Sequence, residues 1–355
     1  MKRESKSVLE TEAVSRRTFL KRAGAAGLAA GTVLSGVDQM KAWAAANENK
    51  QMGSLIDLTK CDGCPSEEIP LCVLACREKN AKHYPQPEHP IKNYWPQKRY
   101  EDWSDNPERI DRLTPYNWTY VEQVEVEHNG VTKKMSIPRR CMHCFDPPCQ
   151  KLCPFGTIYK SEQGAVYIDR DFCMGGSKCR EVCPWEIPQR QAGVGLYLKL
   201  VPELAGGGVM YKCDMCVDLL EEGKEPVCST SCPRGAITFG PMEEIRKLAH
   251  KRKEEINGYI YGEKENGGTA TLYVSDVPFD KIDEAIAKSK AQDPDKRGRP
   301  HMKPDVENML NTAKGWMLAT AIAPVAGMAA AGIAAYKSLK GKQETSSTEE
   351  VGKDG

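Results

Sequence analysis

The cysteines constrain the fold of this chain more than any other feature. The sequence has 355 residues and 15 cysteines, and these fall in four groups along the middle of the chain. The groups are, in order, Cys61, Cys64, Cys72 and Cys76; Cys141, Cys144, Cys149 and Cys153; Cys173, Cys179 and Cys183; and Cys213, Cys216, Cys228 and Cys232. Each group closes with a C-x3-C spacing. In the third group, Gly176 stands where a C-x2-C spacing would place a thiolate.

This spacing predicts iron–sulfur clusters. In bacterial ferredoxins three cysteines of one run hold one cluster, and the last cysteine, followed by proline, reaches the neighbouring cluster. Proline follows the last cysteine in three of the four groups, at Pro154, Pro184 and Pro233. Zinc ribbons instead match one C-x2-C pair with a second pair, and disulfide frameworks belong mainly to small domains with an even number of cysteines. The recurrence of the pattern favours iron–sulfur clusters over zinc or disulfides.

The N-terminal 46 residues predict export in the folded state. Residues 15–21, SRRTFLK, form a twin-arginine signal, and a weakly apolar run follows over residues 23–37. Residues 42–44 or 44–46 offer a cleavage site. The alternative is an uncleaved amphipathic helix, or a chance arginine pair. Because the twin-arginine machinery moves folded proteins, clusters are expected to be inserted in the reducing cytoplasm before export.

A second targeting feature lies near the C-terminus. Residues 316–336 carry no charge, and an apolar helix of about 20 residues spans a bilayer. Trp316 and Tyr336 bracket the segment as interfacial aromatics, and lysines follow in the tail 337–355. This arrangement predicts a transmembrane helix with a cytoplasmic tail and a domain on the periplasmic side of the inner membrane. The small residues and Pro324 suit packing against another membrane helix; the alternative is a buried helix of a soluble domain.

Between these ends we predict one α+β domain at 47–291, with an insert at 77–138, followed by a charged linker at 292–315. The end of the insert alternates around Asn129-Gly130, which predicts a β-hairpin with a type I′ turn. The aromatic residues of the insert are expected to pack it onto the core, with a partner-facing patch as the alternative: Tyr94, Trp95, Tyr100, Trp103, Tyr116, Trp118 and Tyr120. We further expect strands at 165–168 and 236–239, and amphipathic helices at 242–256 and 279–291.

Charge and motifs exclude several function classes. The chain has 50 Lys+Arg against 49 Asp+Glu, so no basic field favours a nucleic-acid partner. There is no Walker loop, dinucleotide fingerprint or G-x-S-x-G elbow. We therefore predict no catalytic residues. His143, between Cys141 and Cys144, is expected to pack near a cluster, because its group already supplies four cysteines; iron binding or tuning by His143 is the alternative.

Four ferredoxin motifs in this order resemble the iron–sulfur subunits of the dimethyl sulfoxide reductase, formate dehydrogenase and nitrate reductase family. With the signal and the membrane helix, the chain is similar to the periplasmic subunits of hydrogenase-2 and of the high-molecular-weight cytochrome c complex. The segments 258–262, 267–269 and 272–274 also resemble the region after the fourth motif in those subunits. The resemblance implies two double-cluster ferredoxin-like modules.

The resemblance also implies a function and partners. Such a subunit relays electrons between a periplasmic hydrogenase, formate dehydrogenase or multihaem cytochrome c and an integral quinone-interacting or cytochrome b subunit. An alternative is a self-sufficient membrane-anchored reductase that uses the three-cysteine cluster as its catalytic centre. That alternative would need a matched acid–base pair beside Cys173 and Cys179, and the sequence offers none.

The ligand sets implied by the resemblance account for every cysteine. They pair the first group with the fourth and the second with the third. The four sets are Cys61, Cys64, Cys72 and Cys232; Cys213, Cys216, Cys228 and Cys76; Cys141, Cys144, Cys149 and Cys183; and Cys173, Cys179 and Cys153. Three thiolates suit a [3Fe-4S] cluster beside three [4Fe-4S] clusters, and one thiolate fewer predicts a higher potential. The alternative is a fourth [4Fe-4S] cluster with Ser177 or water as a ligand.

Overall fold

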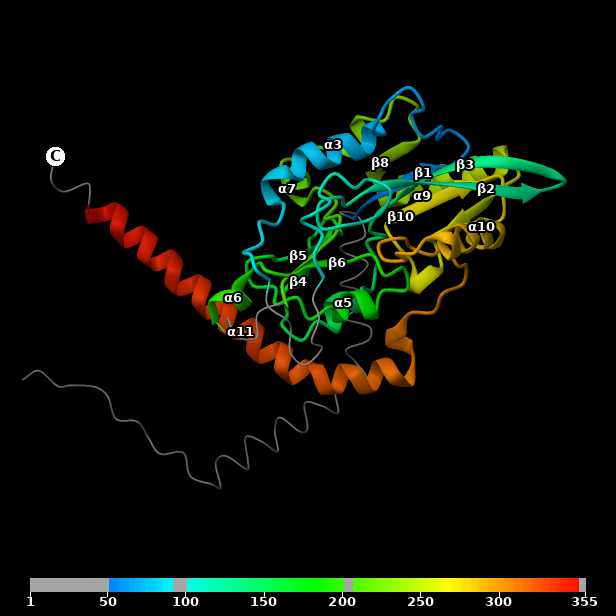
Figure 1. The fold of residues 1–355 in the computed structure, drawn as a ribbon. Coiled ribbons are helices and arrows are strands. Elements are labelled where there is room, and N and C mark those ends of the chain that lie inside the picture. The colour runs from blue at the N-terminus through cyan, green and yellow to red at the C-terminus, as the bar shows by residue number, and fades with distance from the viewer. Residues whose placement is uncertain (1–50, 92–100, 201–206, 351–355) are drawn as a thin grey trace, which may run out of the picture. The chain divides into compact units, whose positions relative to one another are not determined.

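The structure is a computed structural model that describes residues 51–91, 101–200 and 207–350. The predicted twin-arginine signal lies outside the described residues, as do Tyr94, Trp95 and Tyr100 of the insert. The described part combines helices with a four-stranded sheet and three two-stranded sheets (Figure 1). This mixed content agrees with the predicted α+β class.

The four-stranded sheet has the order β8-β1-β10-β9. Its strands are β1 (Met52–Asp57), β8 (Ile237–Pro241), β9 (Tyr259–Tyr261) and β10 (Thr271–Ser275). β1 is parallel to β10 and antiparallel to β8. The register pairs Ile56 with Ile237, so the chain leaving β1 toward Cys61 runs beside the chain that arrives from Cys232. One sheet contact therefore brings together cysteines from the first and fourth groups.

Short elements and connecting loops carry the cysteines. The described helical elements between β1 and β8 are α3 (Leu71–Asn80), η2 (Ala81–His83), α4 (Pro148–Lys151), α5 (Lys178–Glu181), α6 (Leu196–Leu200), α7 (Val217–Glu221) and α8 (Val227–Thr230). The paired strands outside the main sheet are β2 (Tyr120–His128) with β3 (Val131–Arg139), β4 (Ile158–Lys160) with β5 (Val166–Ile168), and β6 (Gln189–Gln191) with β7 (Val209–Tyr211).

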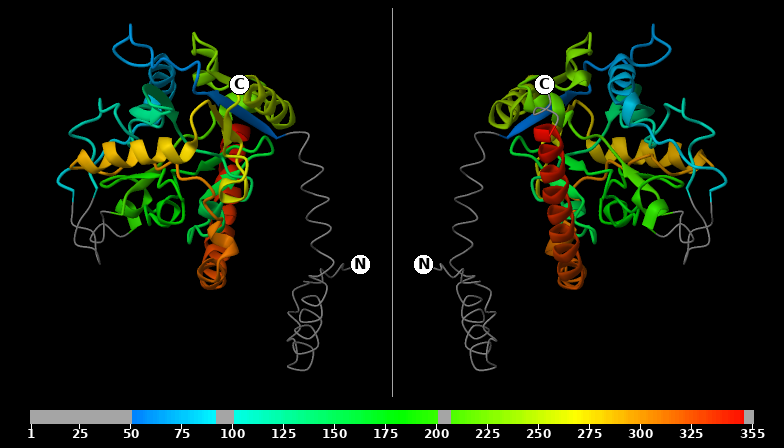
Figure 2. Two further views of the ribbon diagram at one scale, coloured as in Figure 1. Left: turned by 90° about the vertical axis from the view of Figure 1, so that its right-hand side faces the viewer. Right: turned by 90° about the vertical axis from the view of Figure 1, so that its left-hand side faces the viewer.

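Alternation along the strands divides the core into two layers. Leu55, Leu272 and Val274 face α9 (Met242–Glu255), which packs across the sheet (Figure 2). Their neighbours Ile56 and Tyr273 face the core that contains most of the cysteines. Successive side chains of a strand point to opposite faces, so one sheet separates an ordinary apolar layer from the cysteine-rich one.

The predicted hairpin is confirmed. β2 and β3 pair in register up to His128 and Val131, and the two turn residues, Asn129 and Gly130, both have positive φ, at 52° and 75°. A type I′ turn requires φ above zero at both central positions. The inner face of the hairpin packs on α10 (Phe279–Gln292). Helices α9 and α10 also confirm the amphipathic segments expected at 242–256 and 279–291.

The described aromatic residues of the insert are buried. Trp103, Tyr116, Trp118 and Tyr120 are each at most 4% exposed. The indole Nε1 of Trp118 donates to the carbonyl oxygen of Pro115 at 2.8 Å, so its polar atom is satisfied within the core. For these four residues the packing interpretation is confirmed, and they do not form an exposed patch.

The charged segment after α10 is fastened to the domain. The buried guanidinium of Arg112 pairs with Asp293 at 2.5 Å, and Arg299 pairs with the buried Glu122. The backbone joins the domain as well, since Leu113 N donates to the carbonyl oxygen of Gly298 at 2.8 Å. The charges that mark this segment as a linker in the sequence serve here to hold it in place. The segment also contacts η4 (Glu265–Gly267), and it then continues through η5 (Met309–Asn311) into the last helix.

Helix α11 (Ala313–Glu350) contains the predicted apolar segment and extends beyond both of its ends. In the part of the chain that the structure describes, Ala313–Ile333 is the one helical stretch long and apolar enough to cross a membrane. The large side chains of Trp316, Met317 and Met328 are exposed. An exposed apolar surface of this size on one helix fits a membrane or partner contact better than a buried core helix.

Two glycines with similar backbone angles give a matched test of this fold. Gly130 has open space around it, whereas a methyl group at Gly208 (φ 73°) would lie 1.8 Å from the carbonyl oxygen of Gln191. We expect Gly130→Ala to lower the free energy of unfolding by about 1–2 kcal/mol through backbone strain alone. Gly208→Ala should cost clearly more, because it also forces β6 and β7 apart. Denaturant midpoints followed by tryptophan fluorescence measure both, and equal losses would contradict the packing at Gly208.

Candidate iron–sulfur sites

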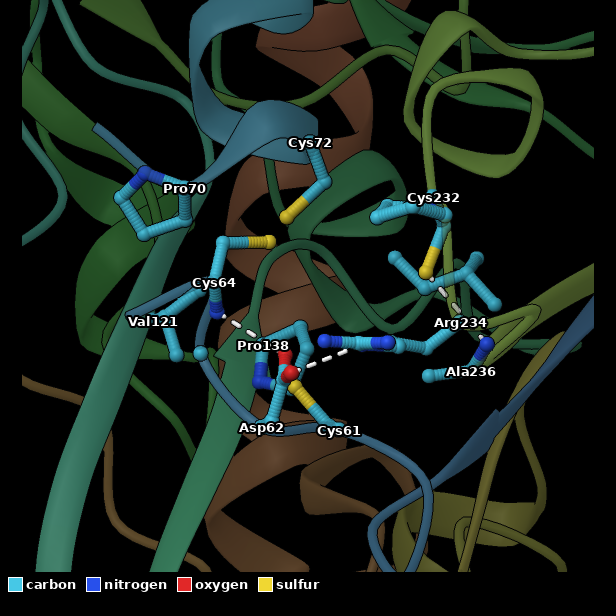
Figure 3. Close-up of a pocket in the computed structure, with 13 residues that line it drawn as sticks. Cys61, Asp62, Cys64, Pro70, Cys72, Val121, Pro138, Cys232, Arg234 and Ala236 are labelled. Carbon is cyan, nitrogen blue, oxygen red and sulfur yellow. Dashed lines mark hydrogen bonds and ion pairs between the residues drawn. The ribbon is translucent and has the colours of Figure 1, made fainter. Parts of the chain in front are cut away.

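The structure brings the first group together with the end of the fourth. Cys61, Cys64, Cys72 and Cys232 line one cavity, and their side chains point into a shared space (Figure 3). Cys61 and Cys64 come from the loop after β1, Cys72 from α3, and Cys232 from the loop before β8. Asp62 beside them accepts a bond from Cys64 N at 3.0 Å and pairs with Arg234 at 2.7 Å, which fixes the loop. Three of the four cysteines are only half-buried.

A second cavity is lined by cysteines of the same two groups, but with one from the first group and three from the fourth. It is lined by Cys76 of the first group and by Cys213, Cys216 and Cys228 of the fourth. Asn80 and Arg140 also line it. Cys76, Cys213, Cys216 and Cys228 are all buried, so this set lies deeper in the domain than the first.

The third cavity holds the group that lacks a cysteine. Cys153, Cys173 and Cys179 line it together with Phe155, Gly176 and Ser177. A methyl group at Gly176 would lie 3.0 Å from Cε2 of Phe155, so an aromatic ring stands beside the position where a fourth thiolate would begin. The hydroxyl of Ser177 is directed to Gly175 O at 3.4 Å and to Met210 Sδ at 3.5 Å.

The remaining cysteines form a fourth set. Burial first, and then the neighbouring thiols of Cys149, Cys183 and Cys141, raise the pKa of Cys144 well above its ordinary value. This mutual effect places the four side chains in one neighbourhood. Three cavities thus collect eleven of the fifteen cysteines, with members exchanged between groups, and the other four lie near one another.

The closing C-x3-C spacing explains this exchange. In each group the first cysteine of that pair lies on a short helix: Cys72 on α3, Cys149 on α4, Cys179 on α5 and Cys228 on α8. The second cysteine follows four residues later: Cys76 is still on α3, about one helical turn or 5.4 Å further along, whereas Cys153, Cys183 and Cys232 lie just beyond the ends of α4, α5 and α8. Helix α3 packs against α8, and α4 packs against α5. Each packed pair therefore sends its sulfurs into two adjacent spaces.

The thiol environments suit a metal rather than free thiolates. Burial raises the pKa of Cys61 and Cys183 to about 11, and that of Cys149, Cys213 and Cys216 to about 12. At neutral pH these groups would remain protonated without a bound cation. Iron coordination removes the proton outright, so the sites fit a positively charged inorganic core that supplies the missing countercharge.

Hydrogen-bond donors aim at the sulfur atoms, which is the second indication of fit. Backbone N–H groups donate to Cys232, Cys173 and Cys213 at 3.3–3.5 Å. Side-chain amides do the same, because Asn266 Nδ2 lies 3.1 Å from Cys144 Sγ and Asn80 Nδ2 lies 3.5 Å from Cys76 Sγ. Metal-bound thiolates are strong acceptors whose hydrogen bonds tune cluster potentials. A protonated thiol would make much weaker use of these donors.

Two buried cations complete the sites, and the sequence analysis missed both. Arg140 Nη1 donates to Cys228 Sγ at 2.8 Å. Burial alone would lower the pKa of Lys212, but the neighbouring Cys141, Cys149 and Cys213 thiolates raise it above its ordinary value. Arg140 and Lys212 are 4% and 5% exposed. A signal was present, since each cation immediately precedes the first cysteine of its group. No comparable feature of the sequence marks Asn266, which does not adjoin a cysteine group.

His143 is buried as expected, but its ring is directed toward a set to which its own group does not contribute. Its Nε2 lies 3.6 Å from Cys213 Sγ, and its Nδ1 accepts a hydrogen bond from Val166 N at 2.9 Å. The residue therefore lies between two cysteine sets.

The two alternative uses of the cysteines find no support in the geometry. All fifteen cysteines lie in the described ranges, and all are free. Within those ranges no group of three or more His, Cys, Asp or Glu side chains closes around a single metal ion. A structural zinc site would require its sulfurs about 2.3 Å from one ion. Eleven of the sulfur-bearing side chains instead line the three cavities described above.

The fold and these four thiol sets define a ferredoxin-type iron–sulfur protein. Comparison with known families agrees, because the model described as "4Fe-4S dicluster domain" matches residues 132–242.

Curated relatives identify the family. The hydrogenase-2 operon protein HybA of Escherichia coli O157:H7 is 30% identical over 312 residues, covering 76% of this chain and 83% of that protein. The formate dehydrogenase-O iron-sulfur subunit of E. coli K12 is 33% identical over 232 residues, covering 63% of this chain and 67% of that protein. The probable anaerobic dimethyl sulfoxide reductase chain YnfG of E. coli K12 is 34% identical over 198 residues, covering 56% and 77%. This chain belongs to the family of iron–sulfur electron-transfer subunits that includes these proteins.

Proposed function

We propose that this chain is the electron-transfer subunit of a membrane-bound respiratory oxidoreductase, held at the periplasmic face of the inner membrane. The observation that carries the proposal is the grouping of eleven cysteines around three cavities, with the remaining four, Cys141, Cys144, Cys149 and Cys183, near one another. Iron–sulfur clusters supply one-electron chemistry when bound. The chain itself needs no acid, base or nucleophile for this role.

We assign the ligands according to the sets that the structure gathers. Cys61, Cys64, Cys72 and Cys232 would hold one [4Fe-4S] cluster, and Cys76, Cys213, Cys216 and Cys228 a second. Cys141, Cys144, Cys149 and Cys183 would hold a third. The residues around these sulfurs exclude water, donate hydrogen bonds and provide countercharge.

For Cys153, Cys173 and Cys179 we propose a [3Fe-4S] cluster. Gly176 offers no ligand, and the ring of Phe155 lies where a side chain from Gly176 would extend. Ser177 Oγ contacts Gly175 O and Met210 Sδ, which supports the three-thiolate assignment over a serine-ligated [4Fe-4S] cluster. Since one thiolate is absent, this centre should have a higher potential than its neighbours.

The two ends of the domain suggest where the partners bind. The set that contains Cys61 has half-buried cysteines and an exposed loop, so we place the periplasmic donor subunit there. Trp316, Met317 and Met328 of α11 are exposed, and Ala313–Ile333 is long and apolar enough to cross a membrane. We therefore place the membrane quinone-interacting or cytochrome b subunit at α11.

The relatives, a hydrogenase-2 operon protein and a formate dehydrogenase iron-sulfur subunit, support a hydrogenase or a formate dehydrogenase as the donor, and a multihaem cytochrome c is our third candidate. The runner-up function, a self-sufficient reductase acting at the three-cysteine set, gains nothing from the geometry. Among the described residues that line this cavity, Lys178 is the only titratable side chain other than the cysteines, and it pairs with Glu181. No acid–base pair faces the cavity.

The exchange of cysteines between groups predicts which variants share a phenotype. Cys61→Ala and Cys232→Ala should remove the same component of the reduced electron paramagnetic resonance (EPR) spectrum, although 171 positions separate them (232 − 61). Cys76→Ala should instead remove the component lost in Cys213→Ala. Ser231→Ala, beside Cys232, is the matched control and should keep every component. A component shared by the Cys61 and Cys76 variants, but not by the Cys61 and Cys232 variants, would refute the assignment.

The three-iron assignment predicts a signal and its conversion. The oxidised protein should show a [3Fe-4S] signal by EPR. If intact oxidised protein lacks that signal, the three-iron assignment is wrong. Gly176→Cys must push the Phe155 ring aside, because its Cβ would start 3.0 Å from that ring. We expect partial conversion to [4Fe-4S] in the single variant and fuller conversion with Phe155→Leu added. The potential of the converted centre should fall; conversion without a fall would contradict the charge argument.

The function itself is tested by what accompanies the chain. Gentle detergent purification from native membranes, followed by metal and haem analysis, should yield a complex that contains iron and a donor subunit. Nickel would indicate a hydrogenase, molybdenum or tungsten a formate dehydrogenase, and excess haem a cytochrome. A lone iron-containing chain that turns over a substrate would instead establish the self-sufficient enzyme.

A further inference from the structure

Two side chains from the second cysteine group contact sulfurs of a set formed by the first and fourth groups. Arg140 immediately precedes Cys141, yet its Nη1 donates to Cys228 Sγ at 2.8 Å. His143 lies between Cys141 and Cys144, yet its Nε2 lies 3.6 Å from Cys213 Sγ. Both sulfurs belong to the set Cys76, Cys213, Cys216 and Cys228. One short segment therefore carries ligands for one proposed cluster and hydrogen-bond donors for another.

The ring of His143 is fixed in one tautomer. Its Nδ1 accepts a hydrogen bond from Val166 N at 2.9 Å, so Nδ1 carries no proton and the neutral ring holds its proton on Nε2. That proton points toward Cys213. The backbone is held as well, because Ala270 N donates to the carbonyl oxygen of His143 at 3.0 Å and the residue has φ 48°. His143 is 1% exposed, so water does not compete for this bond.

Arg140 provides a buried full charge. No carboxylate pairs with it among the ion pairs of the described residues, and its Nε and Nη2 have no hydrogen-bond partner there. The residue lines the cavity of the Cys76 set. An unpaired buried guanidinium is costly unless negative charge lies beside it. A thiolate-bound cluster in this cavity would supply that charge.

Among the described residues, the other sets have no cation hydrogen-bonded to a sulfur; the buried Lys212 donates to the carbonyl oxygens of Val166 and Cys213 instead. Arg234 lines the cavity of Cys61, Cys64, Cys72 and Cys232, but its charge is paired with Asp62 near the surface. Cys144 receives a neutral amide from Asn266, and Cys173 receives a backbone N–H. Within the described ranges, Arg140 is the one charged donor hydrogen-bonded to a cysteine sulfur.

We propose that Arg140 and His143 are positioning residues that raise the reduction potential of the centre held by Cys76, Cys213, Cys216 and Cys228. The inference rests on the proposed function and adds a difference between its [4Fe-4S] centres. Reduction adds negative charge to a cluster, and a buried cation and an N–H donor at its sulfurs stabilise the reduced form more than the oxidised form. Because the donors come from the second group, the neighbouring module controls this potential.

The test is a redox titration of the purified complex, followed by EPR at each potential. Arg140→Met removes the charge with similar volume, and Arg140→Lys keeps it. His143→Leu removes the donor, and His143→Gln retains an amide donor. Arg234→Met is the matched control, since it removes an arginine beside another set whose charge is already paired. Cys228→Ala identifies the EPR component that belongs to this centre.

We expect Arg140→Met to shift the reduction equilibrium of that component at least tenfold toward the oxidised form, which is about 59 mV for one electron. His143→Leu should shift it in the same direction by less, while the Lys and Gln variants stay closer to the parent. The other components should keep their potentials in these variants, and in the Arg234→Met protein the component identified by Cys228→Ala should keep its potential.

The remaining outcomes would contradict either the inference or the proposed function on which it rests. Unchanged potentials in both Arg140→Met and His143→Leu, or equal shifts of every component, would overturn it. If Arg140→Met fails to assemble, the inference depends on His143→Leu and Arg140→Lys, and an unshifted component in His143→Leu overturns it. A parent protein without iron or EPR components would instead refute the proposed function, which separates the two failures.

Discussion

A single helical turn between two cysteines is the constraint on which this structure depends. Cys72 and Cys76 lie four residues apart on α3, and their sulfurs enter two different cavities. Because α3 packs against α8, which returns Cys228 and Cys232 in the opposite sense, two sites form side by side. A turn advances about 5.4 Å, so neither site can move without the other. Helices α4 and α5 also pack against each other, and each carries one cysteine, Cys149 and Cys179.

The two sides of the main sheet differ in what their apolar side chains surround. The α9 layer is an ordinary apolar contact around Leu55 and Val274, whereas the opposite layer places polar and charged side chains among buried sulfurs. Arg140, Lys212, Asn266 and His143 would be unfavourable in an apolar interior. Their presence there, directed at thiols or flanking them, is consistent with an interior organised around negatively charged inorganic clusters.

Much of the local structure could be predicted because it depends on nearby residues. The Asn129-Gly130 turn, α9 and α10 follow from residue type and periodicity. The central place of β1 could not be predicted, because its partners β8 and β10 lie 181 and 217 residues further along the chain (237 − 56 and 271 − 54), and periodicity carries no information about pairing at that distance. The segment after α10 looked like a linker because it is charged, yet Arg112 and Arg299 use that charge to bind it to the domain.

The sequence by itself determined the kind of chemistry, since the cysteine groups follow the spacing of ferredoxin-type iron–sulfur motifs, and it showed Gly176 where a C-x2-C spacing would place a thiolate. It also determined the apolar character of the last helix. Only the tertiary structure decided which groups share a cavity, that Phe155 stands beside Gly176, and that Arg140 and His143 contact a set to which their own group does not contribute. These are contacts between segments distant along the chain, and their geometry depends on how the sheet and short helices pack.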